Sequence, residues 1–342
     1  MELTKLCSTG GCAAKYDARL LGQLLAALPS DSPANLLVGL DPPDDAAVIQ
    51  LSDDTGLVFS VDFFPPIVDD PHTYGRIAAN NALNDIYAMG GNPMLALSIA
   101  AFPGDLPPQD VADIVRGAAE QCLSLGAVLA GGHTIRDKEP KFGLAVAGTV
   151  PIGEIWRKSG ALPGDRLLLT KPIGTGVLAT ARRRGEVSDE DFGSAVDCML
   201  RSSKPVADVL HESHPHAVTD VTGFGLAGHA SEIAQASGVR IVIDMAAVPM
   251  LPDAERCARA EVRTSAHRSN LELIEGILDV DGVIDEPTLA LALDPQTAGG
   301  LLFAVPEEDV AVVTRRLSAA GQPVTEIAEI TSGSGVALTR SS

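Results

Sequence analysis

Hydrophobic and polar positions alternate along the chain with two periods, one typical of helices and the other of strands. Apolar side chains recur at every third or fourth position in residues 71–90 and 108–125, which predicts two long helices. Asp70 and Pro71 fit the cap and first turn of the earlier helix, and a glycine follows each helix. Short apolar runs around them predict strands at residues 36–38, 46–51, 56–62, 94–101, 127–131 and 142–150.

The second half of the chain shows the same mixture of patterns. Strands are predicted at residues 166–170, 217–221, 240–244, 301–305, 325–330 and 335–339. Helices are predicted at residues 176–184, 189–199, 205–212, 225–238, 271–278 and 307–320, and near the N-terminus at 16–28. This mixture predicts an α/β (α+β mixed) fold, and a length of 342 residues favours two domains. The turn-rich connector at residues 151–164 marks the boundary between them.

Composition and charge narrow the class of protein. Hydrophobic residues make up 46% of the chain, which is enough for packed cores, although only 4% of residues are aromatic. A net charge of −20 argues against partners made of nucleic acid or anionic lipid, both of which need basic surfaces. No apolar run reaches the ~20 residues of a membrane span, and the N-terminus lacks the pattern of a secretory signal. The five cysteines are widely spread, which favours a reducing, cytoplasmic location.

The N-terminal residues 1–16 are small, polar and rich in glycine, which predicts a flexible arm or loop. Cys12 is flanked by glycine, so we expect an accessible thiol, and Lys15 could favour its thiolate or contact a phosphate. The alternative is a disordered tail with an idle cysteine. Cys7 has no second Cys or His pair nearby, so a zinc site is not supported; oxidation could join Cys7 to Cys12.

Carboxylates are scattered through both halves at the ends of predicted strands and on one predicted helix. Each one taken alone fits a cap, a turn or a surface charge. Asn81, Asn84 and Asp85, however, share one polar face of a helix whose flanks are small and apolar, which favours a face inside a cleft. Oxygen ligands from strand ends and loops suit Mg²⁺, which also binds phosphate. The candidates are Asp44, Asp45, Asp62, Asp85 and Asp220.

Two glycine motifs are candidates for phosphate sites. Gly132, His133 and Thr134 follow an apolar strand, so they fit either a phosphate cradle or an ordinary tight turn. His133 is the histidine we expect to matter, since the others fit structural or exposed positions. Residues 174–179 match G-x-G-x-x-A, but no strand ending in an acidic residue follows, so a dinucleotide fold is not supported. The chain also lacks a P-loop and a G-x-S-x-G elbow.

Nine segments, taken in order along the chain, form a pattern that no single one of them would give. They are GGCAAK at 10–15, DDAAV at 44–48, VDFFPPIV at 61–68, GRIAANNALNDIYAMGG at 75–91, AGGHT at 130–134, FGLAVAG at 142–148, TKPIGTGVL at 170–178, TDVTGFGLAGH at 219–229 and DPQTAGGLL at 294–302. Together they resemble the selenophosphate synthetase (selenide, water dikinase) family over nearly the whole chain. This family belongs to an ATP-binding superfamily that includes aminoimidazole ribonucleotide synthetase and thiamine-monophosphate kinase. The Gly-Gly-Cys-x-x-Lys element points to the selenium enzymes rather than to these relatives.

The resemblance implies a homodimer that converts ATP, selenide and water into selenophosphate, AMP and orthophosphate, with Mg²⁺ required and K⁺ as a further cation. It also implies three regions: an arm at 1–16 with the catalytic residues, an ATP- and Mg-binding dimerisation domain at 17–155, and a C-terminal domain at 156–342. By analogy, Cys12 and Lys15 take the catalytic positions, and Asp45, Asp85 and Asp220 match magnesium ligands. The nucleotide contacts implied are Lys15, Asp44, Asp62, Asp85, Gly132, His133 and Thr134, the last three reaching across the dimer.

One departure from the family pattern concerns the arm. Some members carry a second cysteine directly before the lysine, where this chain has Ala14, so a cysteine-pair mechanism would need Cys7 instead. Two other functions stay open from the sequence: another kinase of the superfamily, such as a thiamine-monophosphate kinase, and a catalytically silent, nucleotide-binding regulator. The sequence also leaves open whether selenide arrives free or from a delivery protein.

Overall fold

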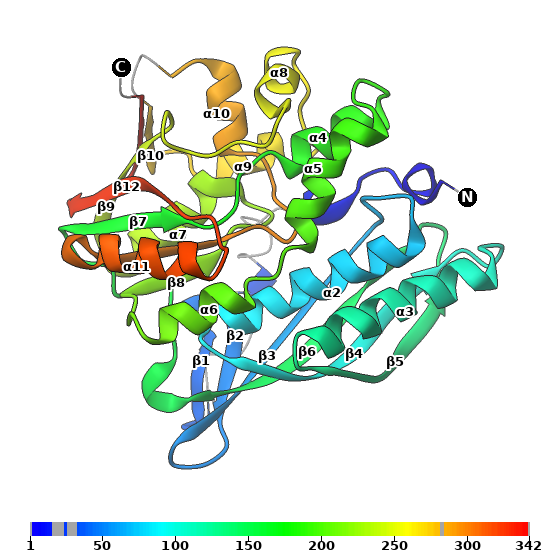
Figure 1. The fold of residues 1–342 in the computed structure, drawn as a ribbon, viewed down its shortest axis with the longest axis horizontal. Helices are drawn as coiled ribbons and strands as arrows, with labels where there is room; N and C mark the ends of the chain where they lie inside the picture. Colours follow the sequence, from blue (N-terminus) through cyan, green and yellow to red (C-terminus); the bar gives the residue numbers. More distant parts are fainter. Residues whose placement is uncertain (1, 16–23, 26–32, 281–283, 341–342) are drawn as a thin grey trace.

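Two β-sheets, one from each half of the chain, form the framework of the structure (Figure 1), a computed structural model that describes residues 2–15, 24–25, 33–280 and 284–340. The first sheet has the strand order β1-β2-β3-β6-β4-β5, and only β4 and β5 are paired in parallel. Its strands are β1 (Leu36–Leu40), β2 (Pro43–Gln50), β3 (Thr55–Phe64), β4 (Asn92–Phe102), β5 (Val128–Arg136) and β6 (Lys141–Pro151).

Helices α2 (Pro71–Ala88) and α3 (Pro108–Ser124) lie side by side across one face of this sheet (Figure 1). Asp70 caps α2 by accepting a hydrogen bond of 2.7 Å from the backbone N–H of Thr73. Gly75 lets the two helices approach closely, because a Cβ atom there would lie 1.9 Å from the carbonyl oxygen of Ile114. Helix α2 is buried on almost every side, since elements of the second half cover its remaining face.

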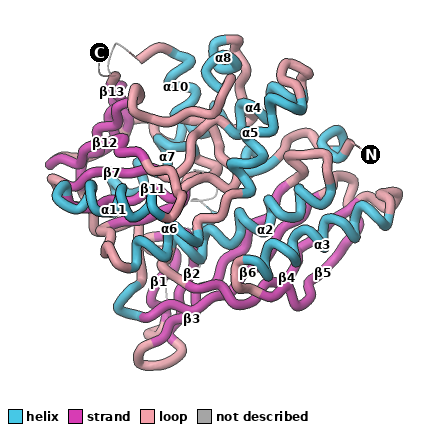
Figure 2. The backbone as a smooth tube through the Cα atoms, viewed as in Figure 1, coloured by secondary structure: helices cyan, strands magenta, loops and turns pink. Residues whose placement is uncertain are grey.

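The second sheet has the order β10-β13-β9-β12-β7-β11-β8. Helix α7 (Gly225–Ser237) packs on β8, β9 and β13, while α11 (Glu307–Ala319) packs on β7 and β11. Figure 2 shows the helices and strands of both halves coloured by type. The strands are β7 (Asp165–Leu169), β8 (Ala217–Asp220), β9 (Val239–Asp244), β10 (Leu278–Val280), β11 (Leu301–Pro306), β12 (Thr325–Ser332) and β13 (Gly335–Thr339). The other helices are α4 (Thr175–Arg183), α5 (Asp189–Leu200), α6 (Lys204–His211), α8 (Ala254–Arg259), α9 (His267–Leu273) and α10 (Glu286–Ala292).

Several local predictions differ from the structure. The arm is not a plain loop: it forms two short 3₁₀ turns, η1 (Leu3–Leu6) and η2 (Gly11–Ala14). The helix predicted at 271–278 is instead the end of α9 followed by β10, and α8 and α10 were not predicted. These are short elements whose residues pack on neighbours far away in sequence, so local periodicity carries little signal for them. The predicted helix at 16–28 lies mostly outside the described residues.

The glycine turn predicted after residue 131 is also wrong, because Gly132, His133 and Thr134 lie within strand β5. Gly132 has a φ of 153°, and a Cβ atom there would lie 2.1 Å from Oγ of Ser98 on the neighbouring strand. The glycine is therefore needed for close strand packing at the bulge between β4 and β5, rather than for a turn.

The face of the first sheet opposite α2 and α3 carries exposed apolar side chains. On β3 they alternate with buried residues, as expected for a strand with one face on the core. A sheet face this apolar is unusual for a surface that faces water. Its exposed side chains are Phe59, Val61, Phe63, Met94, Leu95, Leu97, Val128 and Ile135. Among the described helices, none has the length and apolar character needed to cross a membrane.

Candidate active site

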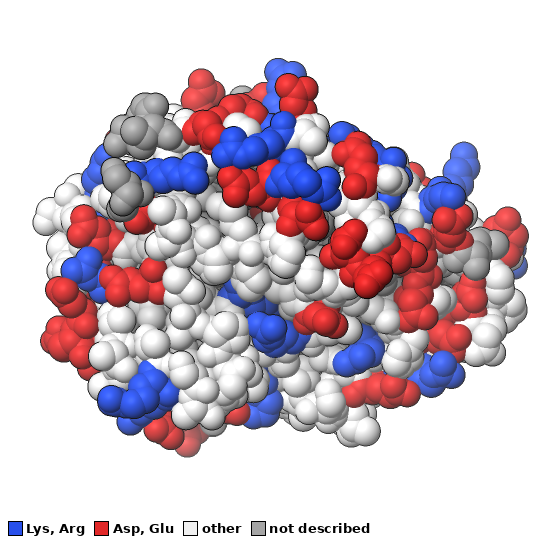
Figure 3. All heavy atoms as spheres, turned by 45° about the horizontal axis from the view of Figure 1, so that its top comes forward, with Lys and Arg blue, Asp and Glu red and all other residues white. Residues whose placement is uncertain are grey.

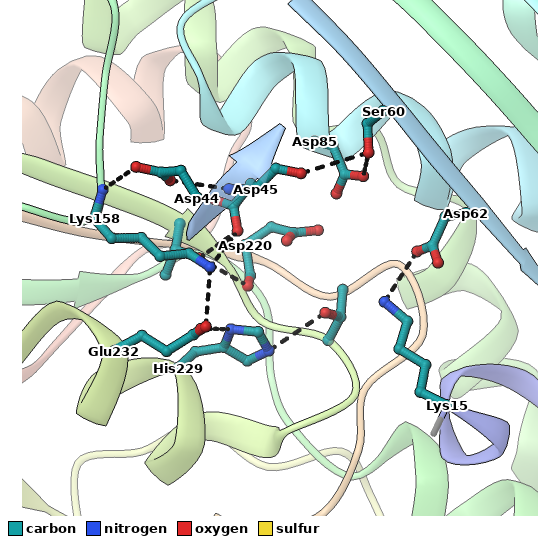
Figure 4. A network of polar contacts seen from close by, with 12 residues as sticks. Lys15, Asp44, Asp45, Ser60, Asp62, Asp85, Lys158, Asp220, His229 and Glu232 are labelled. Carbon is teal, nitrogen blue, oxygen red and sulfur yellow. Dashed lines mark hydrogen bonds and ion pairs between the residues drawn. The ribbon is translucent and has the colours of Figure 1, made fainter. Parts of the chain in front are cut away.

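A cavity of about 610 Å³ lies where the two halves of the chain meet. Strands β2 and β3 and helix α2 supply one wall, while β8, α7 and the connector before β7 supply the other. Figure 4 shows its polar side chains pointing toward one another from these elements. All five aspartates predicted from the sequence line it together with Lys15: Asp44, Asp45, Asp62, Asp85 and Asp220.

The two halves are joined directly at this cavity. Asp45 lies in β2, and its Oδ1 accepts a hydrogen bond of 3.0 Å from the hydroxyl of Thr219, in strand β8 of the other sheet. Asp220 follows Thr219 and ends that strand, which places a second carboxylate on the same side of the cavity. On α2, Asp85 accepts a hydrogen bond of 2.5 Å from Oγ of Ser60, on β3. These contacts bring carboxylates from three elements to one place.

Lys158 is a site residue that the sequence analysis missed. Its Nζ lies 3.0 Å from Oδ1 of Asp45 and 3.2 Å from Oε1 of Glu232, and its backbone N–H donates to Asp44 Oδ2 at 3.1 Å. The side chain is 8% exposed, so the ammonium is a buried counter-charge to this acidic cluster (Figure 4). The only local signal was a lysine directly after Trp156 and Arg157 in a turn-rich connector.

His229 also lies in the cavity, although the sequence analysis placed it among structural or exposed histidines. Its Nδ1 is 2.8 Å from Oε2 of Glu232, one turn further along α7, and its Nε2 is 3.3 Å from the hydroxyl of Thr222. The spacing of His229 and Glu232 at i and i+3 was the signal that could have found this pair. Protonation of the imidazole would make the contact with Glu232 an ion pair.

Burial and mutual repulsion shift the acidity of these carboxyls. Burial, together with the nearby charge of Asp45, raises the pKa of Asp220 to about 8 and that of Asp44 to about 6. Burial and the charges of Asp220 and Asp62 raise the pKa of Asp85 well above its usual range. For Glu232, burial acts in the same direction, but Lys158 and His229 outweigh it and lower its pKa to about 2. The cavity therefore holds more carboxyls than its cations neutralise.

The donor set of this cavity fits a hard divalent cation. Oδ2 of Asp45 and Oδ2 of Asp220 are buried and have no hydrogen-bond partner within the described part of the chain, an arrangement that is costly unless something else contacts them. Carboxylate oxygens are the ligands that Mg²⁺ prefers. Within the described residues, no three His, Cys, Asp or Glu side chains already converge on one ion position. Small side-chain movements toward a cation are therefore part of any binding here.

The N-terminal arm reaches this cavity from a distant part of the sequence. Nζ of Lys15 lies 3.2 Å from Oδ2 of Asp62, which also accepts a hydrogen bond from the amide of Asn81. Burial disfavours the ammonium, but the negative charge of Asp62 outweighs it and raises the pKa of Lys15. Lys15 thus places a cation at the edge of the carboxylate cluster (Figure 4).

Cys12 is buried rather than accessible, in contrast to the expectation from its glycine neighbours. It is 1% exposed; its N–H donates to Oγ1 of Thr297 at 3.0 Å, and its thiol donates to Oδ1 of Asn81 at 3.5 Å. Gly11 has a φ of +60°, and a Cβ atom there would lie 2.4 Å from Thr297 Oγ1, so the turn requires glycine. Burial raises the pKa of the thiol to about 12, although Lys15 acts in the opposite direction. In this closed arrangement the thiol is protonated.

The three residues predicted as a nucleotide-binding turn do not reach this cavity. Gly132, His133 and Thr134 lie on the exposed strand β5, at the edge of the first sheet. Their predicted role in binding the nucleotide across a dimer stays a prediction.

Comparison with known proteins places this architecture in a family. The models of AIR synthase related protein match the chain at residues 43–150 for the N-terminal domain and 163–341 for the C-terminal domain. A selenide, water dikinase of Desulfitobacterium hafniense (strain DSM 10664 / DCB-2) is 44% identical over 88% of each chain. Selenide, water dikinase 2 of Peptoclostridium acidaminophilum is 39% identical over 96% of this chain and 94% of its own. The chain belongs to the selenide, water dikinase family.

The fold is shared more widely than this family. The solved structure of AaThiL complexed with AMPPCP and TMP has a TM-score of 0.67 at 20% identity, covering 95% of this chain and 93% of the other. The predicted mixed α/β fold is therefore confirmed, and its two domains are of the AIR synthase (aminoimidazole ribonucleotide synthetase) type. The bounds predicted for the arm and for the two domains stay a prediction.

Proposed function

We propose that this selenide, water dikinase family member makes selenophosphate from selenide, ATP and water, with AMP and orthophosphate as the other products. The observation that carries the assignment is the meeting of Lys15 and Asp62, 3.2 Å apart, at the rim of a cavity with four further aspartates. It brings the Gly-Gly-Cys-x-x-Lys element of the arm to the place where a metal-bound triphosphate would lie. A kinase without selenium chemistry has no use for that element.

Magnesium is the cation we propose for the cavity, held by Asp45, Asp85 and Asp220. The unpartnered oxygens of Asp45 and Asp220 support this choice. When bound, Mg²⁺ neutralises phosphate charge and stabilises the transferring phosphoryl group. Without a cation, a triphosphate would meet the repulsion of a carboxylate cluster in a chain of charge −20. K⁺ is proposed as a second cation, from the family resemblance alone.

The residues of the chain then have separate tasks. Lys15 exchanges its contact with Asp62 for a phosphate oxygen, and Asp44 and Asp62 hold the nucleotide at the cavity rim. Cys12 lies behind Lys15 and orients the selenium nucleophile against the terminal phosphorus. Two phosphoanhydride bonds are broken in the whole reaction: one phosphoryl group passes to selenium, and one phosphate leaves with an oxygen from water. The arm, docked over the cavity, keeps water from taking the first phosphoryl group.

We also propose that the protein works as a homodimer joined through the apolar outer face of the first sheet. Burying Phe59, Phe63 and Leu97 against a second copy would remove their apolar surface from water. The same association would bring the exposed strand β5, with Gly132, His133 and Thr134, toward the partner. This supports the proposed nucleotide contacts across the dimer.

The test is anaerobic ³¹P NMR of the purified protein with ATP, Mg²⁺, K⁺ and selenide. A selenophosphate resonance that grows together with an equal amount of AMP is expected. ADP without AMP would identify a simple kinase of the same fold instead. Nucleotide binding without turnover would identify a regulatory protein.

A further inference from the structure

A second cavity, of about 310 Å³, lies on the other side of the arm from the carboxylate cavity. Among the residues that the structure describes, it is lined by four arginines and by no Asp or Glu side chain, so its charge differs from that of the carboxylate cavity. Residues on both sides of Cys12 form part of its wall. The lining residues that matter here are Gly10, Ala13, Arg182, Arg183, Arg184 and Arg263.

Two of these arginines form no ion pair with a carboxylate of the described residues. Arg182 pairs with Asp69 and Asp189, and Arg263 pairs with Glu286. Among the described residues, Arg183 and Arg184 donate only to backbone oxygens. Arg183 donates to Cys7 at 3.5 Å and to Ser8 at 2.9 Å, and Arg184 donates to Arg263 at 3.5 Å. This arginine cavity therefore carries an excess of positive charge within a chain of net charge −20. Acidic and basic side chains are mixed over the face of the molecule drawn in Figure 3.

The arginine cavity lies directly behind the catalytic arm. Gly10 and Ala13 line it, and the hydroxyl of Ser265 on its wall donates to the carbonyl of Ala13 at 3.1 Å. Lys15, two residues further on, lines the carboxylate cavity instead. The turn η2 that carries Cys12 thus separates a basic cavity from an acidic one.

We propose that the arginine cavity binds a small anion, and that this anion is hydroselenide held behind Cys12 before it reaches the nucleotide. The identity of the anion rests on the proposed function. Hydroselenide is an anion at neutral pH, so the carboxylate cavity repels it, whereas unneutralised guanidinium groups attract it and raise its local concentration. The cavity volume is many times the roughly 10–15 Å³ that a cavity must offer to hold one water, so a partly hydrated anion fits. Orthophosphate, a product of the proposed reaction, is also an anion and is the competing ligand for this cavity.

The kinetic test uses Arg184→Gln, because this side chain does not hold the arm. We expect the KM for selenide to rise about tenfold while the KM for ATP is unchanged, and Arg184→Lys to recover most of the loss. Arg268→Gln, at a side chain that is 89% exposed on α9, is the matched control and should leave both constants unchanged. An unchanged KM for selenide, or an equal rise in the KM for ATP, would overturn the proposal.

A binding measurement separates this proposal from the proposed function. Crystals soaked anaerobically in selenide and measured at the selenium absorption edge should show a peak in the arginine cavity, absent in Arg184→Gln. No peak there overturns the site, whether or not the protein makes selenophosphate. A peak that survives equimolar orthophosphate supports hydroselenide, and one that orthophosphate displaces overturns that assignment. If the wild type makes no AMP from ATP and selenide, the proposed function fails, and the soak still decides whether the anion site exists.

Discussion

The ammonium of Lys158 lies 3.0 Å from Oδ1 of Asp45, so a lysine already neutralises one of the carboxylates proposed to bind magnesium. The same ammonium is 3.2 Å from Glu232. Burial opposes its charge, but Asp45, Glu232 and Asp44 outweigh burial and raise the pKa of Lys158. Lys158 is therefore a buried, protonated counter-charge to the carboxylates of the cavity.

Replacing this lysine should therefore make the fold depend on a divalent cation. In Lys158→Gln we expect a loss of about 3–5 kcal/mol of unfolding free energy, the usual cost of removing one partner of a buried ion pair. Added Mg²⁺ should restore more stability in this variant than in the wild type, as measured by thermal unfolding. Lys204→Gln, which removes an exposed i, i+4 pair with Asp208, is the control and should change stability by less than ~1 kcal/mol. An equal response of both variants to Mg²⁺ would contradict this role.

Cys12→Ser should abolish selenophosphate formation and leave nucleotide affinity within about twofold, because the thiol contacts Asn81 and not the carboxylates. The measurements are ³¹P NMR for the product and calorimetry for nucleotide binding. Cys7→Ser is the matched control in the same arm and should remain active. Lost nucleotide affinity in Cys12→Ser would make Cys12 a structural residue.

Asp85→Asn should weaken magnesium-dependent nucleotide binding by at least about tenfold, or ~1.4 kcal/mol, because an amide is a poorer ligand for Mg²⁺ than a carboxylate. The amide oxygen can still accept the hydrogen bond from Ser60, so the fold should persist. Calorimetric titrations with Mg²⁺ and with EDTA measure the effect, and Asp53→Asn, at an exposed turn, is the control. If Asp85→Asn bound the nucleotide with wild-type affinity in Mg²⁺, Asp85 would leave the set of ligands.

Asp294 should make the stability of the fold depend on pH away from the active site. Burial raises its pKa to about 7, although hydrogen bonds from backbone N–H groups and Gln296 act in the opposite direction. The folded state then binds the proton more tightly than the unfolded state does, so this contribution to stability is largest at acidic pH. It is lost as the pH rises through about 7.

The contribution of Asp294 to the free energy of unfolding falls by about 2–3 kcal/mol between pH 5 and pH 8, because its pKa in the folded state is raised by roughly three units. Denaturant unfolding across this range should show that decline in the wild type relative to Asp294→Asn. Asp105→Asn, at an exposed position, should follow the wild type. A constant difference between the wild type and Asp294→Asn over this range would refute the role of Asp294.

The proposed dimer can be tested by placing a charge on the apolar sheet face. Leu97→Glu, on β4, should give a monomer in light scattering, because burying an unpaired carboxylate at an interface costs several kcal/mol. Leu123→Glu is the control: Leu123 is 73% exposed but lies on α3, against the opposite face of the sheet. A wild-type mass that is already monomeric, or a dimer that survives Leu97→Glu, would argue against this interface.

The sequence by itself determined most of the long helices and strands and the candidate active-site residues. The apolar periodicity of neighbouring residues predicts helices α2 and α3 and the main strands. Local residue types predict the cap at Asp70 and the glycine that follows α3. The motif around Cys12 and Lys15 and the five aspartates were visible because residue type and family resemblance single them out. Neither source of information depends on how distant parts of the chain meet.

The tertiary structure decided which of these residues come into contact. It also decided which of them are buried, and so which are protonated. Lys158 and Glu232 are 74 positions apart, and Thr219 and Asp45 are 174 apart, so no local pattern announces either contact. Burial of Cys12 depends on Thr297, at the far end of the chain, and that burial keeps its thiol protonated where its glycine neighbours suggested exposure. Desolvation and ion pairing act through space, and a sequence records only order along the chain.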